Sequence, residues 1–182
     1  MLNKFKSEIL RYDTFLRLIE VEDYRFLYEI RNDSVRNQYV SSINEDIVAQ
    51  KVWLENYKLR ELKGEEFYFV VGTENKQLFG TTRLYDFKNG SFTIGSWVFK
   101  ESSPEGLAIL GDIIAREIGF DVLGFDRCQF EVRKNNKKVL NYHKLWKPKL
   151  IFEDDLNYYF ELTKKEFNLS KLKFLKLLGH GY

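Results

Sequence analysis

A strand, a turn and a helix are predicted in succession by residues 92–123, which are FTIGSWVFKESSPEGLAILGDIIAREIGFDVL. The first part, Phe92 to Phe99, is rich in aromatic and β-branched residues and too short for a typical helix, so it predicts a buried strand. Pro104 follows and stops the strand. Beyond the proline, apolar residues recur at near-helical spacing, which predicts an amphipathic helix from about Glu105 to Phe120.

The turn between this strand and this helix is suited to an anion. Gly106 falls in the first turn of the predicted helix, where a residue without a Cβ lets the backbone approach a ligand closely. The first N–H groups of a helix have no partner within the helix and attract groups such as a pyrophosphate. Most strand–turn–helix units serve packing alone, so the phosphate hypothesis needs a second feature.

A second unit of the same kind provides that feature. Residues 127–132 predict another strand, and residues 133–138 place basic and amide side chains ahead of another helix. Two such units in tandem suggest one ligand shared between adjacent strands. Lys134, Lys137 and Lys138 either contact phosphates of that ligand or form an ordinary solvated turn.

The remaining segments predict a mixed α/β fold, in which helices flank a mostly antiparallel sheet of about seven strands. A first strand is expected at Thr14–Ile19, after an ambiguous leader. Consecutive strands joined by tight turns, one of which contains Asn89-Gly90, favour an antiparallel meander over a doubly wound sheet. The further strands are expected at 67–71, 78–85, 91–99, 149–152 and 156–162.

Three more helices are expected outside these units. One spans about Glu22–Arg31, and a longer one begins at an N-cap residue, Asn44, and ends near Leu62. The last predicted helix, 168–178, has an apolar face formed by leucines at helical spacing. These leucines are Leu169, Leu172, Leu175 and Leu178.

Composition limits the function classes. The 182 residues suit a single domain, 1–182, with 164–182 as a C-terminal helical tail. The charge is nearly balanced, 29 Lys plus Arg against 27 Asp plus Glu, which argues against a nucleic-acid or membrane partner. The chain lacks a long apolar run and a signal-peptide core, so a cytoplasmic location is expected. The single cysteine, Cys128, is interpreted as a core residue, and no Cys/His spacing suggests a metal.

The turn between the predicted strand that ends at Phe99 and the predicted helix that follows also resembles a known motif. Residues 103–108 are similar to the acyl-CoA loop of the GNAT acetyltransferases, whose pattern is Gln or Arg, two residues, Gly, one residue, then Gly or Ala. Gly106 and Ala108 match this pattern. Ser103 stands where the basic or amide residue is usual.

A later segment has the spacing of that family's next strand and helix, which fall on Glu131, Val132, Asn136, Val139, Leu140 and His143. Asn136 matches the asparagine that reaches the pantetheine arm in this family. His143 matches a position at which the family often has a tyrosine that acts as the general acid. The usual Gly-Phe after this helix is replaced by Lys147 and Pro148. The segment 16–35 also resembles the opening of the amino-sugar and ribosomal-protein branches, so the resemblance covers about residues 14–163.

The resemblance implies acetyl transfer from acetyl-CoA to a primary amine, without a metal. His143 would be the catalytic proton donor. The alternative is that His143 is a surface histidine without a functional role. The general base is not assigned, although Asp86 and Glu101 lie at plausible strand ends. The expected cofactor-binding residues are Trp97, Val98, Phe99, Ser103, Pro104, Glu105, Gly106, Leu107, Ala108, Asn136 and Lys138.

The resemblance also implies an acceptor, the amine of a nucleotide-linked amino sugar for surface-glycan synthesis. Arg31 and Asn32 are the expected substrate-binding residues, and Tyr39, Trp53 and Tyr57 could stack on a ring. Core packing is the competing interpretation for each aromatic residue. A protein N-terminal amine, as in the ribosomal-protein branch, remains the alternative acceptor. A noncatalytic binding domain and a homodimer also stay open.

Overall fold

The computed structural model describes residues 8–32 and 46–181. Within them, eight strands and five α-helices alternate in a mixed α/β order, which confirms the predicted fold class with one strand more than expected. The strands are β1 (Ile9–Arg11), β2 (Thr14–Leu18), β3 (Phe67–Thr73), β4 (Leu78–Lys88), β5 (Ser91–Phe99), β6 (Arg127–Arg133), β7 (Lys149–Glu153) and β8 (Asn157–Thr163). The helices are α1 (Tyr24–Arg31), α2 (Ile47–Lys63), α3 (Leu107–Glu117), α4 (Lys137–Lys144) and α5 (Lys164–Leu177), with a 3₁₀ turn η2 (Val21–Asp23) and a π-helical turn η4 (Ile118–Val122).

The strand order is β1-β2-β3-β4-β5-β6-β8-β7. Strand pairs β1–β2, β2–β3, β6–β8 and β7–β8 are antiparallel, whereas β5 and β6 are parallel. The additional strand is β1, which lies in the segment that was predicted only as an ambiguous leader. No helix in the described ranges is both long enough and apolar enough to span a membrane.

The chain divides into two compact units. The first unit contains the described residues up to Arg83 together with 96–111, and the second contains 84–95 together with the residues from Asp112 onward. Strands β4 and β5 and helix α3 each have residues in both units.

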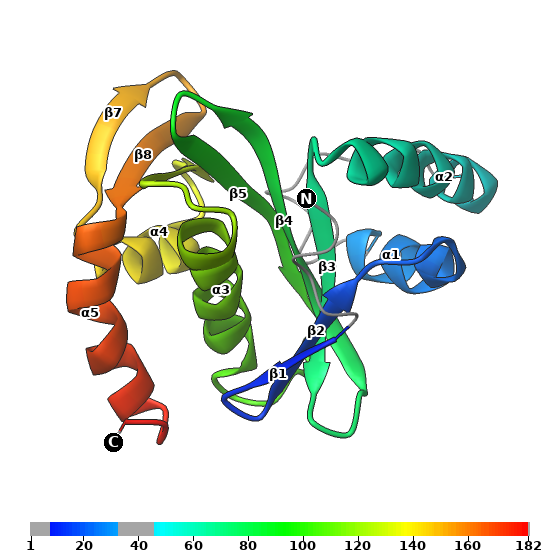
Figure 1. Ribbon diagram of the computed structural model, residues 1–182, viewed down its shortest axis with the longest axis horizontal. Helices are drawn as coiled ribbons and strands as arrows, with labels where there is room; N and C mark the ends of the chain where they lie inside the picture. Colours follow the sequence, from blue (N-terminus) through cyan, green and yellow to red (C-terminus); the bar gives the residue numbers. More distant parts are fainter. Residues whose placement is uncertain (1–7, 33–45, 182) are drawn as a thin grey trace. The chain divides into compact units, whose positions relative to one another are not determined.

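In the first unit, α1 and α2 pack side by side against β3 (Figure 1). Their shared core consists of Ile19, Leu27, Leu54, Tyr57, Tyr68 and Val70, all fully buried. Helix α2 begins after Asp46, whose carboxylate accepts a hydrogen bond from the Val48 N–H at 2.8 Å, and it ends at Gly64 with a φ of 71°. Asp46 is therefore the N-cap, and the prediction of Asn44 was wrong; Asn44 itself lies outside the described residues.

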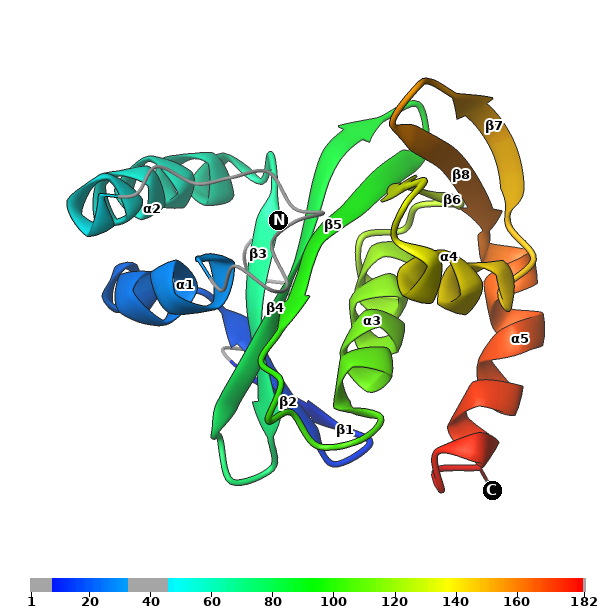
Figure 2. The same ribbon diagram turned by 180° about the vertical axis from the view of Figure 1, so that it is seen from behind.

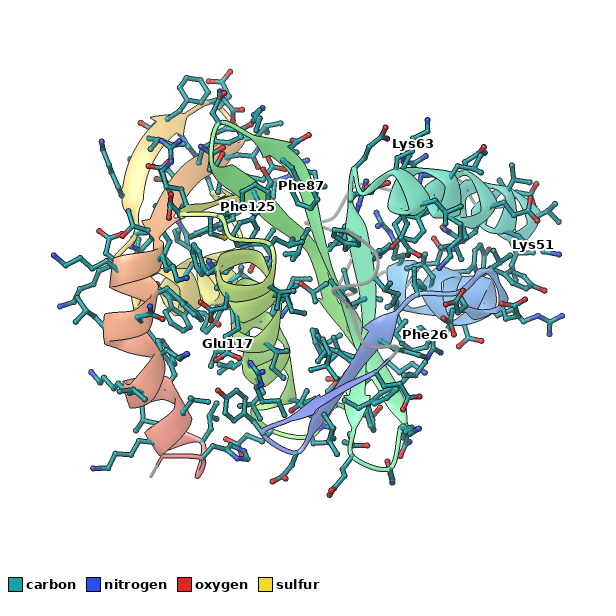
Figure 3. The ribbon with its side chains drawn as sticks, viewed as in Figure 1. Phe26, Lys51, Lys63, Phe87, Glu117 and Phe125 are labelled. Carbon is teal, nitrogen blue, oxygen red and sulfur yellow. The ribbon has the colours of Figure 1, made fainter. Side chains whose placement is uncertain are left out.

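In the second unit, β6 pairs with β8 along its whole length, and α4 lies between α3 and α5 (Figure 2). The face of β6 that carries Cys128 and Phe130 is buried against these helices, because Arg116 of α3 and His143 of α4 contact it. The Asn89-Gly90 turn between β4 and β5 has a positive φ at both residues, as expected for a tight hairpin. Phe87 and Phe125, which Figure 3 labels, lie close together. Their ring centroids are 5.1 Å apart.

Helix α5 is part of the core of the second unit. Its buried residues are Phe167, Phe174 and Leu175, and the Phe174 ring stacks on Trp146 at 4.2 Å. The predicted leucine face was wrong in part, because Leu169 is 74% exposed and Leu172 is 67% exposed. Phenylalanines rather than the regularly spaced leucines therefore determine which side of α5 packs.

Candidate functional site

The turn between β5 and α3 has a backbone suited to close approach of a ligand. The Ser103 N–H and hydroxyl both donate to the Lys100 carbonyl, at 3.1 and 2.6 Å. Gly106 has a φ of 82°, which favours glycine. Helix α3 begins at Leu107, so Gly106 immediately precedes the helix and does not lie in its first turn as predicted. The first N–H groups of α3 follow this glycine and provide a place for an anion.

The end of β5 is fixed against the start of α3. The Trp97 indole N–H donates to the Ala108 carbonyl at 2.9 Å, while Val98 and Leu107 are buried. A Cβ added at Gly80 would lie 2.3 Å from the Phe99 ring, so this ring packs directly against the β4 backbone. Of the predicted cofactor residues in this turn, Pro104 and Glu105 are exposed.

Ser96 is a feature that the sequence predictions missed. It has a φ of 49° in the middle of β5, and its carbonyl accepts a hydrogen bond from the Thr81 hydroxyl at 2.8 Å. A left-handed residue inside a strand is typical of a β-bulge, which redirects the neighbouring backbone groups. The preceding Gly95 was a signal for this irregularity, because glycine inside a strand often accompanies a bulge.

The start of α4 carries the second group of predicted residues. Asn136 is the N-cap of this helix, and its side-chain oxygen accepts a hydrogen bond from the Val139 N–H at 3.2 Å. Lys138, in the first turn, is exposed. Asn136 therefore stabilises the helix start, and its side-chain NH₂ group still offers donors to a ligand.

His143 lies on the buried side of α4. It is 6% exposed, and its ring centroid is 4.6 Å from that of Phe130 and 4.9 Å from that of Tyr142. Burial lowers the pKa of His143 from 6.5 to about 4, although the carboxylate of Asp112 acts in the opposite direction. The expectation that this imidazole changes charge near neutral pH was therefore wrong, as was a surface position. A neutral ring donates a hydrogen bond through its N–H, and it can give up a proton only after it has accepted one at its other nitrogen.

A buried polar network next to His143 was not predicted. The Arg116 guanidinium pairs with Asp112 at 2.9 Å and donates to the Cys128 sulfur at 3.2 Å, and the Tyr142 hydroxyl donates to Asp112 at 2.7 Å. Burial disfavours the charge on Arg116, but the pKa of Arg116 is nevertheless raised because Asp112 stabilises the charged form. Burial raises the pKa of the Cys128 thiol to about 12, which supports its interpretation as a core residue. The i,i+4 spacing of Asp112 and Arg116 within an apolar helix was the available signal.

The predicted acceptor residues lie in the first unit, as far as the structure describes them. Arg31 is half-buried at the end of α1 and Asn32 is exposed; Asp33 and Tyr39 lie outside the described residues. The Lys100 ammonium, in the turn after β5, lies 4.9 Å from the ring of Phe26, which belongs to α1 and is labelled in Figure 3. The helix that carries Arg31 therefore contacts the turn that precedes α3.

The two aromatic residues of α2 pack into the core of the first unit. Tyr57 is fully buried and donates to Glu61 at 2.5 Å, which favours core packing over ring stacking with a ligand. Burial, followed by the Glu61 carboxylate, raises the pKa of Tyr57. The half-buried Trp53 stacks on Tyr57 at 5.9 Å, and Arg60 and Arg83 each lie 5.5 Å from its ring.

The two carboxylates considered as bases, Asp86 and Glu101, are both exposed. Asp86 has a φ of 51° near the end of β4.

Residues 8–32 and 46–181 contain no group of three or more His, Cys, Asp or Glu side chains that could hold a metal ion.

Comparisons with known proteins agree with this arrangement. The model of the acetyltransferase (GNAT) domain family matches residues 13–144. The structure of apo FdhC, a nucleotide-linked sugar GNAT, is 37% identical in sequence to this chain, and the two superpose with a TM-score of 0.86. The alignment covers 96% of this chain and 100% of the FdhC chain. No curated protein matches the sequence.

More distant structures share the fold alone. RimJ from Mycobacterium smegmatis, in complex with CoA-disulfide, is 15% identical with a TM-score of 0.75, over 92% of this chain and 90% of that chain. The ribosomal-protein-S5-alanine acetyltransferase from Vibrio fischeri is 13% identical with a TM-score of 0.72, over 89% of this chain and 99% of that chain.

Proposed function

Because the chain belongs to the GNAT acetyltransferase family, we propose that it transfers an acetyl group from acetyl-CoA to the primary amine of a nucleotide-linked amino sugar. The observation that carries the acceptor class is the likeness to FdhC, which is 37% identical and covered over its whole length. The likeness to the ribosomal-protein enzyme is only 13% and supports the fold rather than a peptide acceptor.

The turn before α3 and the start of α4 are the proposed cofactor-binding segments. Gly106, with its positive φ, allows the pyrophosphate to approach the first N–H groups of α3. Lys138, exposed on α4, would meet a phosphate, and the NH₂ group of Asn136 would donate to the pantetheine arm. Trp97, Val98 and Phe99 at the end of β5 would line this site together with the residues of the turn.

In the proposed reaction, the neutral amine attacks the thioester carbon, so that a C–N bond forms, the C–S bond breaks and its electron pair goes to sulfur. Backbone N–H groups near Ser96, redirected by the left-handed residue, would polarise the thioester oxygen. The amine nitrogen releases one proton as the amide forms, and the thiolate takes one up. His143 as the donor of that proton stays a prediction, and its neutral ring would first have to accept the proton that the amine releases before passing it to the sulfur.

The replacement of the usual Gly-Phe by Lys147 and Pro148 does not favour a noncatalytic domain. Lys147 has a φ of 56°, a conformation that glycine adopts most easily. The backbone at this position is therefore in the left-handed region even though the side chain differs.

A cytoplasmic location and a homodimer stay predictions.

A thiol-release assay tests the proposed function. The protein would be given acetyl-CoA with a nucleotide-linked amino sugar, with a peptide bearing a free N-terminal amine, or with no amine. We expect thiol release only with the amino sugar and a product whose mass is increased by one acetyl group. A preference for the peptide would overturn the acceptor class, and no turnover with any amine would favour a binding domain.

A further inference from the structure

A cavity of about 280 Å³ lies on the sheet of the second unit. Its lining comes from five strands and consists of Tyr85, Asp86, Lys88, Thr93, Gln129, Phe130, Glu131, Ile151, Tyr159 and Phe160. Along β6, Gln129 and Glu131 alternate with the buried Cys128 and Phe130, so their side chains lie on the face away from α3 and α4. Phe130 is shared between the cavity lining and the buried network, because its ring lies 4.9 Å from the Arg116 guanidinium.

We infer that this cavity binds the amino-sugar ring of the acceptor, with Asp86 and Glu131 as the side chains that select its amine and hydroxyl groups. The inference rests on the proposed function and adds a site for the acceptor, for which the sequence predicted Arg31 and Asn32 as binding residues and offered Trp53 and Tyr57 as stacking partners. Four observations support it: the rings in the lining, its charge, the position of Glu131 and the volume.

Two tyrosine rings form walls of the cavity. Tyr85 packs over Gly95, where an added Cβ would lie 3.0 Å from the tyrosine oxygen. Tyr159 stands opposite Glu131 in the β6–β8 pairing, and its hydroxyl donates to Asp154 at 2.8 Å. Both rings have a defined position. Aromatic faces are suited to the apolar C–H surface of a sugar ring.

The charges in the lining favour a cation. The lining contains two carboxylates, Asp86 and Glu131, and one ammonium, Lys88, so it carries one excess negative charge. A sugar amine is protonated when it reaches the protein near neutral pH, and a carboxylate holds both that ammonium and neighbouring hydroxyl groups. The left-handed backbone of Asp86, with a φ of 51°, redirects its side chain relative to a regular strand.

Glu131 also lies next to a change in strand pairing. The parallel pairing of β5 and β6 joins Ser91–Thr93 to Arg127–Gln129, and Glu131 follows two residues after the last pair on the same face of β6 as Gln129. Gln129 is itself oriented by a hydrogen bond to Glu161 at 3.1 Å. Glu131 therefore has an ordered neighbour on one side and Tyr159 on the other.

The volume indicates how much of the acceptor enters. A cavity of about 280 Å³ is slightly below the range of roughly 300–1,000 Å³ that encloses drug-sized ligands. A single hexose ring is smaller than such ligands, whereas a nucleotide diphosphate sugar is larger. The amino-sugar ring is therefore the part that the cavity holds, and the nucleotide remains outside it.

Binding calorimetry with matched variants tests the inference. Glu131→Gln and Asp86→Asn remove one charge each from exposed positions and keep the side-chain shape, so both variants should fold. We expect each to weaken binding of the nucleotide-linked amino sugar by about 10-fold or more, as for loss of a charged hydrogen-bond partner. Asp155→Asn changes an exposed carboxylate outside the cavity and should bind as the wild type does.

Two further titrations separate this inference from the proposed function. CoA should bind all of these variants with unchanged affinity. A sugar nucleotide with a hydroxyl in place of the amine should bind the wild type more weakly than the amino sugar, and Glu131→Gln should reduce that difference. If the wild type acetylates the amino sugar but both cavity variants bind it normally, the cavity assignment is overturned. If the wild type acetylates a peptide instead, the acceptor class itself is wrong.

Discussion

His143 shows how burial changes what a side chain can do. Its pKa falls from 6.5 to about 4 in the folded protein, mainly because burial disfavours the charged ring. Above pH 6.5 the ring is neutral in both the folded and the unfolded chain, and folding is not opposed by protonation. Below that pH the unfolded chain binds a proton more readily, so stability is lost as the pH falls towards 4.

This residue leads to a prediction about acid stability. The shift in pKa corresponds to a loss on the order of 3 kcal/mol between pH 6.5 and 4. His143→Phe, which keeps an aromatic ring against Phe130, should lose that part of the pH dependence. Urea unfolding of both proteins at pH 7 and pH 4.5 measures it, and the carboxylates common to both cancel in the comparison. Equal losses of stability in the two proteins would contradict the assignment.

At the scale of an element, the start of α3 is the feature most closely tied to CoA. Gly106 precedes the helix with a φ of 82°, so any side chain there costs roughly 1–2 kcal/mol of backbone strain. Gly106→Glu should abolish CoA binding, because it adds bulk and negative charge beside the proposed pyrophosphate position. Calorimetry with CoA measures the effect.

Gly106→Ala is the matched control for this prediction. It introduces the same strain at the positive φ but no charge and little bulk, so its CoA affinity should fall less than that of the glutamate variant. Unchanged CoA affinity in Gly106→Glu would remove the basis for placing the pyrophosphate at this turn. Equal losses in the two variants would assign the effect to backbone strain instead.

At the scale of the whole molecule, the two compact units are expected to unfold together. The boundary between them divides β4 after Arg83, β5 after Gly95 and α3 after Gly111. Neither unit therefore consists of complete elements, and each would lose part of two strands and a helix without the other. We propose that 1–182 is a single cooperative domain.

The three tryptophans provide probes for this prediction. Trp53 and Trp97 belong to the first unit and Trp146 to the second. Trp146→Phe leaves reporters only in the first unit, and Trp53→Phe combined with Trp97→Phe leaves one only in the second. In each variant, we expect the urea midpoint from fluorescence to coincide with that from circular dichroism. A fluorescence midpoint that differs from circular dichroism in either variant would show that the units unfold separately.

The sequence by itself determined the elements whose stability is local. The β5 segment is strand-forming because β-branched and aromatic residues suit a pleated surface, and Asn89-Gly90 specifies a tight turn because both residues tolerate a positive φ. The order of strands and helices followed from these local preferences and identified the fold class. The resemblance of 103–108 to the acyl-CoA loop also lies within one short segment, and the match of the GNAT domain model to residues 13–144 confirms the family that this segment suggested.

The tertiary structure decided which face of an element is buried and what its side chains can do. The spacing of leucines in α5 predicted one face, but Phe167 and Phe174 occupy the space beside Trp146 and turn Leu169 and Leu172 outward. The pKa of His143 likewise depends on Phe130, and the cavity joins residues of five strands. Burial and electrostatic interaction depend on neighbours that are distant in the sequence, so no local pattern contains them.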